Sequence, residues 1–345
     1  MNITNNRKHL LPLSAATALA LSAQAQYTFE KVEAPGFSNI QAVAINSSGT
    51  ITGNANWPID SGGFSGYDNL AMFIREGSVM TAVTIPGPRN STVATGINNS
   101  GTICGNFLFF TSLPIPGFTR TQDGQVTSPI TDTAGKHSFH PAAIDDKGEL
   151  IGGNFVFDRG NYVFVSVASP GARPAGTQLI AVNSAGVILG QDYEFDSGGN
   201  FVSRYFLSDA AGGELKGFDG IKLKSDVTLP TPAGVAQWSP TALDASGVVA
   251  GNGTDTQGAS HGFLLKNGQL TTIDFPAQVW PPEYSVDDPI AGGTLHFTLY
   301  GANPTTISGL NDQGDIVGYA AGYYADDTFS YFTTKFVSFV GHPGR

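Results

Sequence analysis

The chain of 345 residues is poor in cysteine, in charge and in long hydrophobic runs, and each shortage excludes a class of protein. One cysteine cannot form a disulfide framework, so the fold has to be stabilised by packing. Only 13% of the residues are charged, and the net charge is −11, which disfavours nucleic acids and anionic membranes as partners. Beyond the first 25 residues, no apolar run is long enough to span a bilayer.

The first 25 residues are expected to be a secretory signal peptide. Arg7 and Lys8 form its positive region, Leu10–Ser22 its apolar run, and Ala23-Gln24-Ala25 its cleavage site. Removing these two cations with the signal changes the net charge from −11 to −13. We expect residues 26–345 to form a single repeat domain that is secreted, either extracellular or periplasmic, and monomeric.

What the chain has in abundance is repetition, together with 44 glycines and 20 prolines. A ten-residue phrase returns six times: a small residue, an aliphatic, Asn or Asp, two free positions, Gly, a free position, an aliphatic, a free position and Gly. The copies begin at Ala44, Gly96, Ala143, Ala181, Ala242 and Gly309. Self-similarity at a spacing of some tens of residues indicates a repeat architecture.

The phrase predicts a β-hairpin. Asn or Asp opens a tight turn because its side chain can bond to the backbone two residues on. The first Gly takes a left-handed conformation, and the final Gly indicates that another backbone comes close. Cys104 stands at a position where other copies carry small or aliphatic residues, which predicts a buried, unreactive thiol.

A second hairpin follows most copies, and an aromatic column runs through it. Its members are Phe73, Phe118, Phe206, Phe263 and Phe332. Two hairpins per repeat make a four-stranded antiparallel blade, so we predict an all-β, six-bladed β-propeller. The third repeat is short and is expected to be a three-stranded blade.

The N-terminal segment is expected to close the ring. Thr28–Ala34 aligns with the fourth strand of other repeats, and we predict that it pairs with Phe329–Phe336 to complete the sixth blade. An alternative is that Val337–Val340 supplies the fourth strand.

The six phrases, together with His261-Gly262-Phe263 and the following Gly268, Thr271 and Pro276, resemble the HAF family of bacterial extracellular repeat proteins. The resemblance covers nearly the whole mature chain and implies secretion and a propeller-like fold. It implies no reaction, and no residue is carried over as catalytic.

Long connections, among them Phe275–Thr306, are expected on one face of the propeller, and repeat proteins often bind there. Bulky aromatics gather in these segments, and large rings suit sugars and peptides alike. The candidate ligand-binding residues are Trp57, Trp238, Trp280, Tyr284, Tyr323 and Tyr324. The alternative is that these rings only fill the core or the central channel.

Two acidic pairs, Asp287–Asp288 and Asp326–Asp327, are expected on the same face of blade six. Four converging carboxylates could hold Ca²⁺, which takes several carboxylate oxygens as ligands. The alternative is that these acids point into solvent and hold no metal, and no other cofactor is expected.

Three functions remain open from the sequence. The first is a binding or scaffold module for a carbohydrate or a protein partner. The second is a polysaccharide hydrolase or lyase, with Glu283 and Asp287 as acid and base. The third is a structural surface protein without a ligand. No combination of nucleophile and base is visible, which favours a binding role over an enzyme.

Overall fold

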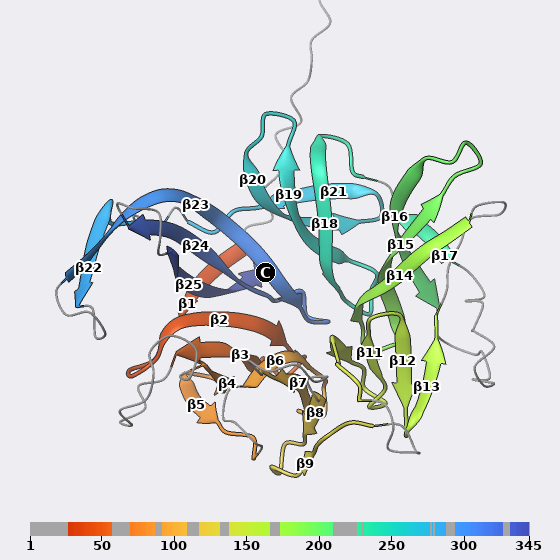
Figure 1. Ribbon diagram of the computed structural model, residues 1–345, viewed down its shortest axis with the longest axis horizontal. Helices are drawn as coiled ribbons and strands as arrows, with labels where there is room; N and C mark the ends of the chain where they lie inside the picture. Colours follow the sequence, from red (N-terminus) through yellow and green to blue (C-terminus); the bar gives the residue numbers. More distant parts are fainter. Residues whose placement is uncertain are drawn as a thin grey trace, which may run out of the picture.

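We describe the protein from a computed structural model. It describes residues 27–56, 70–86, 92–108, 117–131, 138–165, 173–209, 226–229, 231–276, 278, 280–287, 294–326 and 332–344. All regular structure in these ranges is β-strand, and no helix there is long and apolar enough to cross a membrane. The strands form six sheets around a central axis, along which Figure 1 looks. The predicted six-bladed β-propeller is confirmed.

Five blades are four-stranded sheets of consecutive antiparallel strands. Blade 1 contains β2 (Ser38–Ile45), β3 (Ile51–Asn56), β4 (Leu70–Glu76) and β5 (Val79–Val83), and blade 2 contains β6 (Thr92–Ile97), β7 (Ile103–Phe107), β8 (Gly117–Arg120) and β9 (Val126–Thr127). Blade 3 contains β10 (Ala143–Ile144), β11 (Leu150–Gly152), β12 (Phe155–Asp158) and β13 (Asn161–Phe164). Blade 4 contains β14 (Arg173–Val182), β15 (Val187–Phe195), β16 (Phe201–Asp209) and β17 (Asp226–Leu229), and blade 5 contains β18 (Val235–Leu243), β19 (Val249–Asp255), β20 (Ser260–Lys266) and β21 (Gln269–Ile273).

Blade 6 joins the two ends of the described chain. It consists of β23 (Thr294–Leu310), β24 (Ile316–Asp326), β25 (Phe332–Pro343) and, as its outer strand, β1 (Tyr27–Val32). The N-terminal strand therefore closes the ring, as predicted. It pairs with residues 338–343, and the prediction that it pairs with Phe329–Phe336 is wrong. The alternative, in which Val337–Val340 forms the fourth strand, is also wrong, because these residues belong to the third strand, β25.

The third repeat forms a complete but small blade of four strands, and the expectation of three is wrong. Asp158 pairs with Asn161 across a turn of only two residues, Arg159 and Gly160. Both have positive φ, 47° and 88°, as a two-residue hairpin turn of this kind requires. A turn this tight leaves room for the fourth strand that the short repeat seemed to lack.

Blade 6 extends beyond the ring. β23, β24 and β25 have 17, 11 and 12 residues, and β22 (Glu283–Asp287) pairs with the start of β23. Figure 1 shows this end of the blade reaching away from the axis. Much of the segment Phe275–Thr306, which we expected to be a connection, is therefore strand.

The aromatic column follows the final glycine of each phrase. A Cβ on Gly53 would lie 2.1 Å from the Gln41 carbonyl oxygen and 2.8 Å from the Phe73 ring, so the predicted close approach of another backbone is present. In blade 6 the ring opposite the glycine is Phe339, which pairs with Gly318. The assignment of Phe332 to the column is wrong, because Phe332 lies seven residues earlier, in the extension.

The six Asn or Asp residues of the phrase form a ring of turns at one end of the axis, which we call the turn ring. One side-chain oxygen of each residue accepts from backbone amides of its own turn; Asn46 Oδ1, for example, accepts from the amides of Ser48 and Thr50 at 3.1 and 2.9 Å. Four side-chain amides also donate to a carbonyl of the next turn, in the pairs Asn46–Asn98, Asn98–Asp145, Asn183–Asp244 and Asn311–Asn46.

Asp312 closes this end of the axis. Its carboxylate accepts from Ser47 and Ser184 at 3.3 and 2.7 Å and from the Ala245 amide at 2.8 Å, which brings turns from three other blades together. The cavity left among the turns is about 60 Å³, enough for one or two waters. We call this end the closed face and the opposite end the open face.

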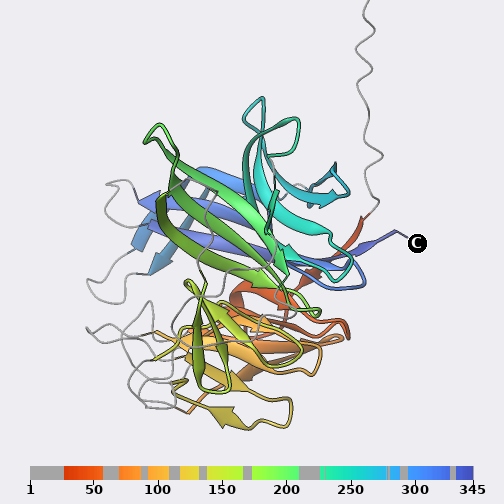
Figure 2. The ribbon, with the colours of Figure 1, turned by 90° about the vertical axis from the view of Figure 1, so that its right-hand side faces the viewer.

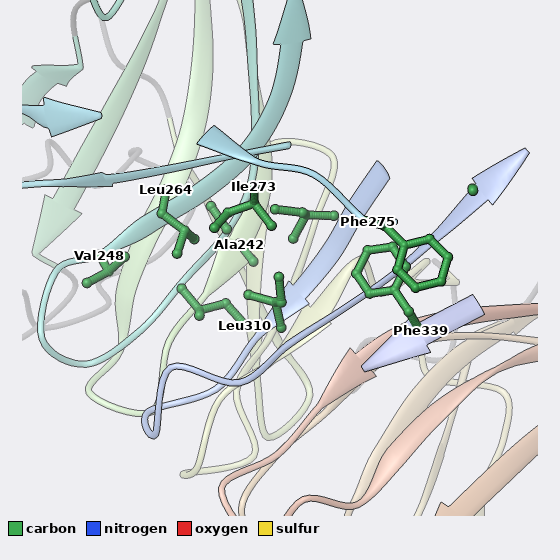
Figure 3. Close-up of a cluster of buried hydrophobic side chains, with 11 residues drawn as sticks. Ala242, Val248, Leu264, Ile273, Phe275, Leu310 and Phe339 are labelled. Atoms are coloured by element: carbon green, nitrogen blue, oxygen red, sulfur yellow. The ribbon is translucent and has the colours of Figure 1, made fainter. Parts of the chain in front are cut away.

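Blades pack on one another through buried apolar clusters. Figure 3 shows the cluster between blades 5 and 6, in which Ala242, Leu264 and Ile273 of blade 5 meet Leu310 and Phe339 of blade 6. Phe275 stacks on Phe339 with the ring centroids 4.5 Å apart. Phe29 of β1 packs edge-on against both rings, so the closing strand is part of this core.

Candidate functional site

Five aromatic side chains lie on one side of blade 6, where it extends past the ring. We call them the aromatic strip: Tyr300, Tyr319, Tyr323, Phe332 and Phe336. The centroid of the Tyr300 ring lies 6.3 Å from that of Tyr323 and 6.1 Å from that of Phe332. Tyr319 packs edge-on against Phe336 at 5.3 Å. Tyr300 is 56% and Phe332 is 60% exposed, so the outer end of the strip faces solvent.

Strand alternation puts these rings on the same side of the sheet. Tyr319 and Tyr323 are four residues apart on β24, and Phe332 and Phe336 are four apart on β25, so each pair points to one side. The register opposes Tyr323 to Thr334 and Ala321 to Phe336, which aligns the two pairs. In Figure 2, this end of blade 6 and the β15–β16 hairpin project from the same side of the ring, which is the open face.

A groove of about 510 Å³ opens where β1 separates from β25. We call it the closure groove; it is lined by residues 32–40 and 336–338. Most of its lining is apolar, and Glu33 is its acidic residue. At one end Ser338 donates to the Ile40 carbonyl at 2.6 Å and accepts from the Ala42 amide at 3.0 Å, which ties blade 6 to blade 1. Phe336 belongs to both the groove and the aromatic strip.

The two predicted tryptophans that the structure describes, Trp238 and Trp280, lie away from this strip. Trp57 lies outside the described residues. Trp238 is 7% exposed and packs against Phe263, with centroids 6.1 Å apart, so little of its ring is accessible. Trp280 is half-buried and covers Gly322, where an added Cβ would lie 2.8 Å from the indole. The two described tryptophans thus pack within blades 5 and 6.

The predicted tyrosines divide between the two sides of blade 6. Tyr323 belongs to the aromatic strip. Tyr324 is fully buried on the other side, donates to the Pro281 carbonyl at 3.0 Å, and has its pKa raised by burial and by the neighbouring Tyr284. Tyr284 stacks on Phe297 at 5.3 Å, and the Lys335 ammonium lies 3.5 Å from its ring centroid. This second side is a packed aromatic layer with one cation.

Two of the four residues of the predicted calcium site lie outside the residues that the structure describes. Asp288 and Asp327 lie outside the described residues. Asp326 is 8% exposed and opposes Phe297 of β23. Asp287 opposes Thr294, three residues before Phe297 on β23. Among the described residues, no group of three or more His, Cys, Asp or Glu is placed to hold a metal. Calcium binding by the four carboxylates stays a prediction.

Blade 4 contains a buried charged cluster that the sequence did not point to. Asp192 is fully buried, accepts from Thr177 at 3.2 Å, and lies 3.7 Å from the Arg204 guanidinium. The same guanidinium lies 4.0 Å from Glu194. Burial raises the pKa of Asp192 to about 6, against the opposing effect of the Arg204 charge.

The raised pKa of Asp192 predicts a pH-dependent stability. The folded chain holds a proton on Asp192 that the unfolded chain has released above its ordinary pKa of about 4, so this contribution is largest in acid and is lost as pH rises through about 6. Asp192→Asn keeps an oxygen for Thr177 and cannot ionise. We expect its melting temperature, relative to the native chain, to be higher at pH 7.5 than at pH 4.5. An equal difference at both pH values, by calorimetry, would contradict this.

Comparison with known proteins gives only distant structural similarities. No family model and no curated protein matches the chain. Among solved structures, it is similar to the Hadza microbial sialidase Hz136 (11% identity, 86% of this chain and 57% of that one, TM-score 0.25) and to Trypanosoma rangeli sialidase (8%, 90% and 55%, TM-score 0.27). It is also similar to a glycoside hydrolase of family 32 from Bifidobacterium adolescentis (10%, 89% and 78%, TM-score 0.29). The chain spans little more than half the length of the two sialidases.

Proposed function

We propose that the protein is a secreted binding module that holds a carbohydrate chain on the aromatic strip of blade 6. The observation that carries this proposal is the arrangement of Tyr300, Tyr323 and Phe332, whose rings contact one another while two of them remain more than half exposed. Exposed rings held on a sheet offer rigid apolar surface at low entropic cost, and tyrosine adds a hydroxyl for hydrogen bonds. This is the chemistry that stacking on sugar rings requires.

The strip is held rigidly by the blade. Tyr319 and Tyr323 stand on the middle strand β24, between β23 and β25, and the half-buried Phe336 fixes the inner end of the strip beside the closure groove. A ligand lying along β25 from Phe332 to Phe336 would cover four residue steps, about 13 Å. That length corresponds to two or three sugar units, which favours an oligomeric ligand over a monosaccharide.

The hydrolase or lyase alternative receives less support from this geometry. Glu283 and Asp287 lie four residues apart on β22, which separates their Cα atoms by about 13 Å. Acid–base pairs of glycosidases hold their carboxyl groups about 5–9.5 Å apart. Asp192 and Glu194, the buried acids of blade 4, are on another blade and are engaged by Arg204.

Removal of a strip residue is expected to weaken carbohydrate binding. Tyr300→Ala and Tyr323→Ala should each reduce affinity for a bound polysaccharide by about tenfold, which corresponds to roughly 1.4 kcal/mol for a lost stacking contact. Affinity electrophoresis against neutral and acidic polysaccharides, followed by calorimetry on those retained, measures this.

Phe201→Ala is the matched control, because Phe201 is 60% exposed but lies on blade 4, where it stacks with Tyr193. It should bind like the native chain. An equal loss in Phe201→Ala, or unchanged binding in both tyrosine variants, would place the ligand elsewhere. Retention of no polysaccharide would refute the carbohydrate proposal and leave a protein partner as the alternative.

A further inference from the structure

The outer edge of β25 is covered along only part of its length. β1 pairs with residues 338–343 and leaves the sheet at Val32. From Thr333 to Val337, the only neighbouring strand among the described residues is β24, on the other edge. A strand edge of this kind presents N–H and C=O groups in a row and is a template for another strand.

Thr333–Val337 lacks the usual protections of such an edge. It contains no proline, and its pairing with β24 runs without a bulge. Its one charge is Lys335, and the Lys335 ammonium lies over the Tyr284 ring, on the side of the sheet away from the aromatic strip. As far as the described residues go, the backbone of this stretch is therefore open to an added strand.

The edge is complementary to a second copy of itself. If two copies pair antiparallel about a twofold axis at Thr334, then Thr334 opposes Thr334 and Phe332 opposes Phe336 on either side. Each pair joins side chains on the same side of the sheet, as antiparallel pairing requires. Two aromatic pairs would then flank the axis. If the twofold axis were moved by one residue, to Lys335, the two Lys335 side chains would lie directly opposite each other. Like charges in that position are unfavourable.

The closure groove provides space for the exposed ring. Phe336 lines the groove, so Phe332 of the second copy would lie at the mouth of this hollow of about 510 Å³. Pro35, Phe37 and Val337 line the groove and are at least partly exposed, so they supply apolar surface there. An exposed ring and an apolar hollow on one edge satisfy each other when a twofold axis relates two copies.

We propose that the chain forms a twofold dimer in which the β25 edges of two copies pair from Phe332 to Phe336. Each Phe332 is seated against the closure groove of the other copy. This assembly goes beyond the proposed carbohydrate binding and does not depend on it. The two proposals share Phe332, so in the dimer the exposed stacking surface is left to Tyr300 and Tyr323. It joins the two blade 6 sheets and places both aromatic strips on one side of a continuous sheet. The contact is short, which is typical of weak, reversible association.

The first test places like charges on the axis. Sedimentation velocity from 1 to 100 μM should show the native chain passing from monomer to dimer, and Thr334→Lys should raise the dissociation constant at least tenfold. Thr28→Lys is the matched control, because Thr28 is an exposed threonine on β1, the outer strand of the same blade. It should dimerise like the native chain. A native chain that stays monomeric at 100 μM overturns the proposal.

If Thr334→Lys folds poorly by itself, two further measurements test the same contact. An equimolar mixture of Thr334→Lys and Thr334→Glu should form a heterodimer, because opposite charges then meet across the axis. Thr334→Cys should form a disulfide-linked dimer under mild oxidation, since the native Cys104 is fully buried. Thr28→Cys should stay monomeric. Equal cross-linking in both cysteine variants, or no heterodimer from folded partners, overturns the proposed edge pairing and leaves another partner for the strand.

Discussion

Deleting residues 26–36 should lower the melting temperature of the mature chain by about 10 °C or more. This segment contains β1, whose Val32 is 1% exposed and whose Phe29 packs against Phe275 and Phe339. Burial of two such side chains stabilises by roughly 1.5–3 kcal/mol each, and loss of the strand also removes its hydrogen bonds. An ion pair between Glu30 and Arg75, which joins β1 to blade 1, is lost as well.

Point variants separate the role of the strand from that of chain length. Phe29→Ala should reproduce much of the loss, and Thr28→Ala, at the exposed neighbouring position, should change the melting temperature little. Differential scanning calorimetry of the three proteins measures this. A deletion variant that melts with the native chain would show that β1 adds nothing to ring closure.

Gly318→Ala should prevent stable folding. A Cβ at this position would lie 2.0 Å from the Thr306 carbonyl oxygen and 2.8 Å from the Phe339 ring, and neither the inner strand nor the stacked ring can move without opening blade 6. We expect this steric overlap to lower the free energy of unfolding by more than about 4 kcal/mol, a loss that only the most damaging substitutions cause. Urea unfolding followed by tryptophan fluorescence, or loss of soluble expression, would report it.

Gly301→Ala is the control in the same blade. The nearest atom to its added Cβ is Tyr323 Cδ2 at 3.7 Å, an ordinary contact, and its φ is not positive. The alanine should be neutral or slightly stabilising, because it restricts the unfolded chain. If both glycine variants unfolded alike, close approach would not be the reason for the final glycine of the phrase.

The phrase predicted the blades because each of its positions has a local physical reason. The turn residue bonds its own backbone, and the final glycine meets the inner strand, as in Gly53 and Gly318. These requirements act within one hairpin, so the hairpin can be predicted from a short stretch of sequence. Ring closure was also predictable, because β1 carries the pattern of a fourth strand.

The candidate site was less predictable because it depends on how far blade 6 extends. Phe332 lies 14 residues after Gly318 and Phe339 lies 21 after it, whereas the other members of the column follow their glycine by 12–20 residues. The spacing therefore favours Phe332, and only the pairing of Gly318 with Phe339 shows that Phe339 is the right choice. That choice moves Phe332 from the core to the surface. Trp238 illustrates the opposite error, because a large ring near a loop is as readily buried as exposed. Two signals could have located the strip: the four-residue spacing of Tyr319 and Tyr323, and its repetition in Phe332 and Phe336.

The turn ring divides the propeller into two arcs of unequal length. Side-chain amides link blade 6 to blade 1, blade 1 to blade 2 and blade 2 to blade 3, and a separate link joins blade 4 to blade 5. The series of links is interrupted at Asp145 and Asp244, because an aspartate side chain has no amide group that could donate a hydrogen bond. The longer arc contains the Asn311–Asn46 link and runs from blade 6 through blades 1 and 2 to blade 3. The N-terminal half of the ring is therefore hydrogen-bonded to the last blade of the chain. At the two interruptions, between blades 3 and 4 and between blades 5 and 6, neighbouring blades are held by buried apolar clusters and, between blades 5 and 6, by the hydrogen bond from the Ala245 amide to Asp312, in place of a side-chain amide of the turn ring.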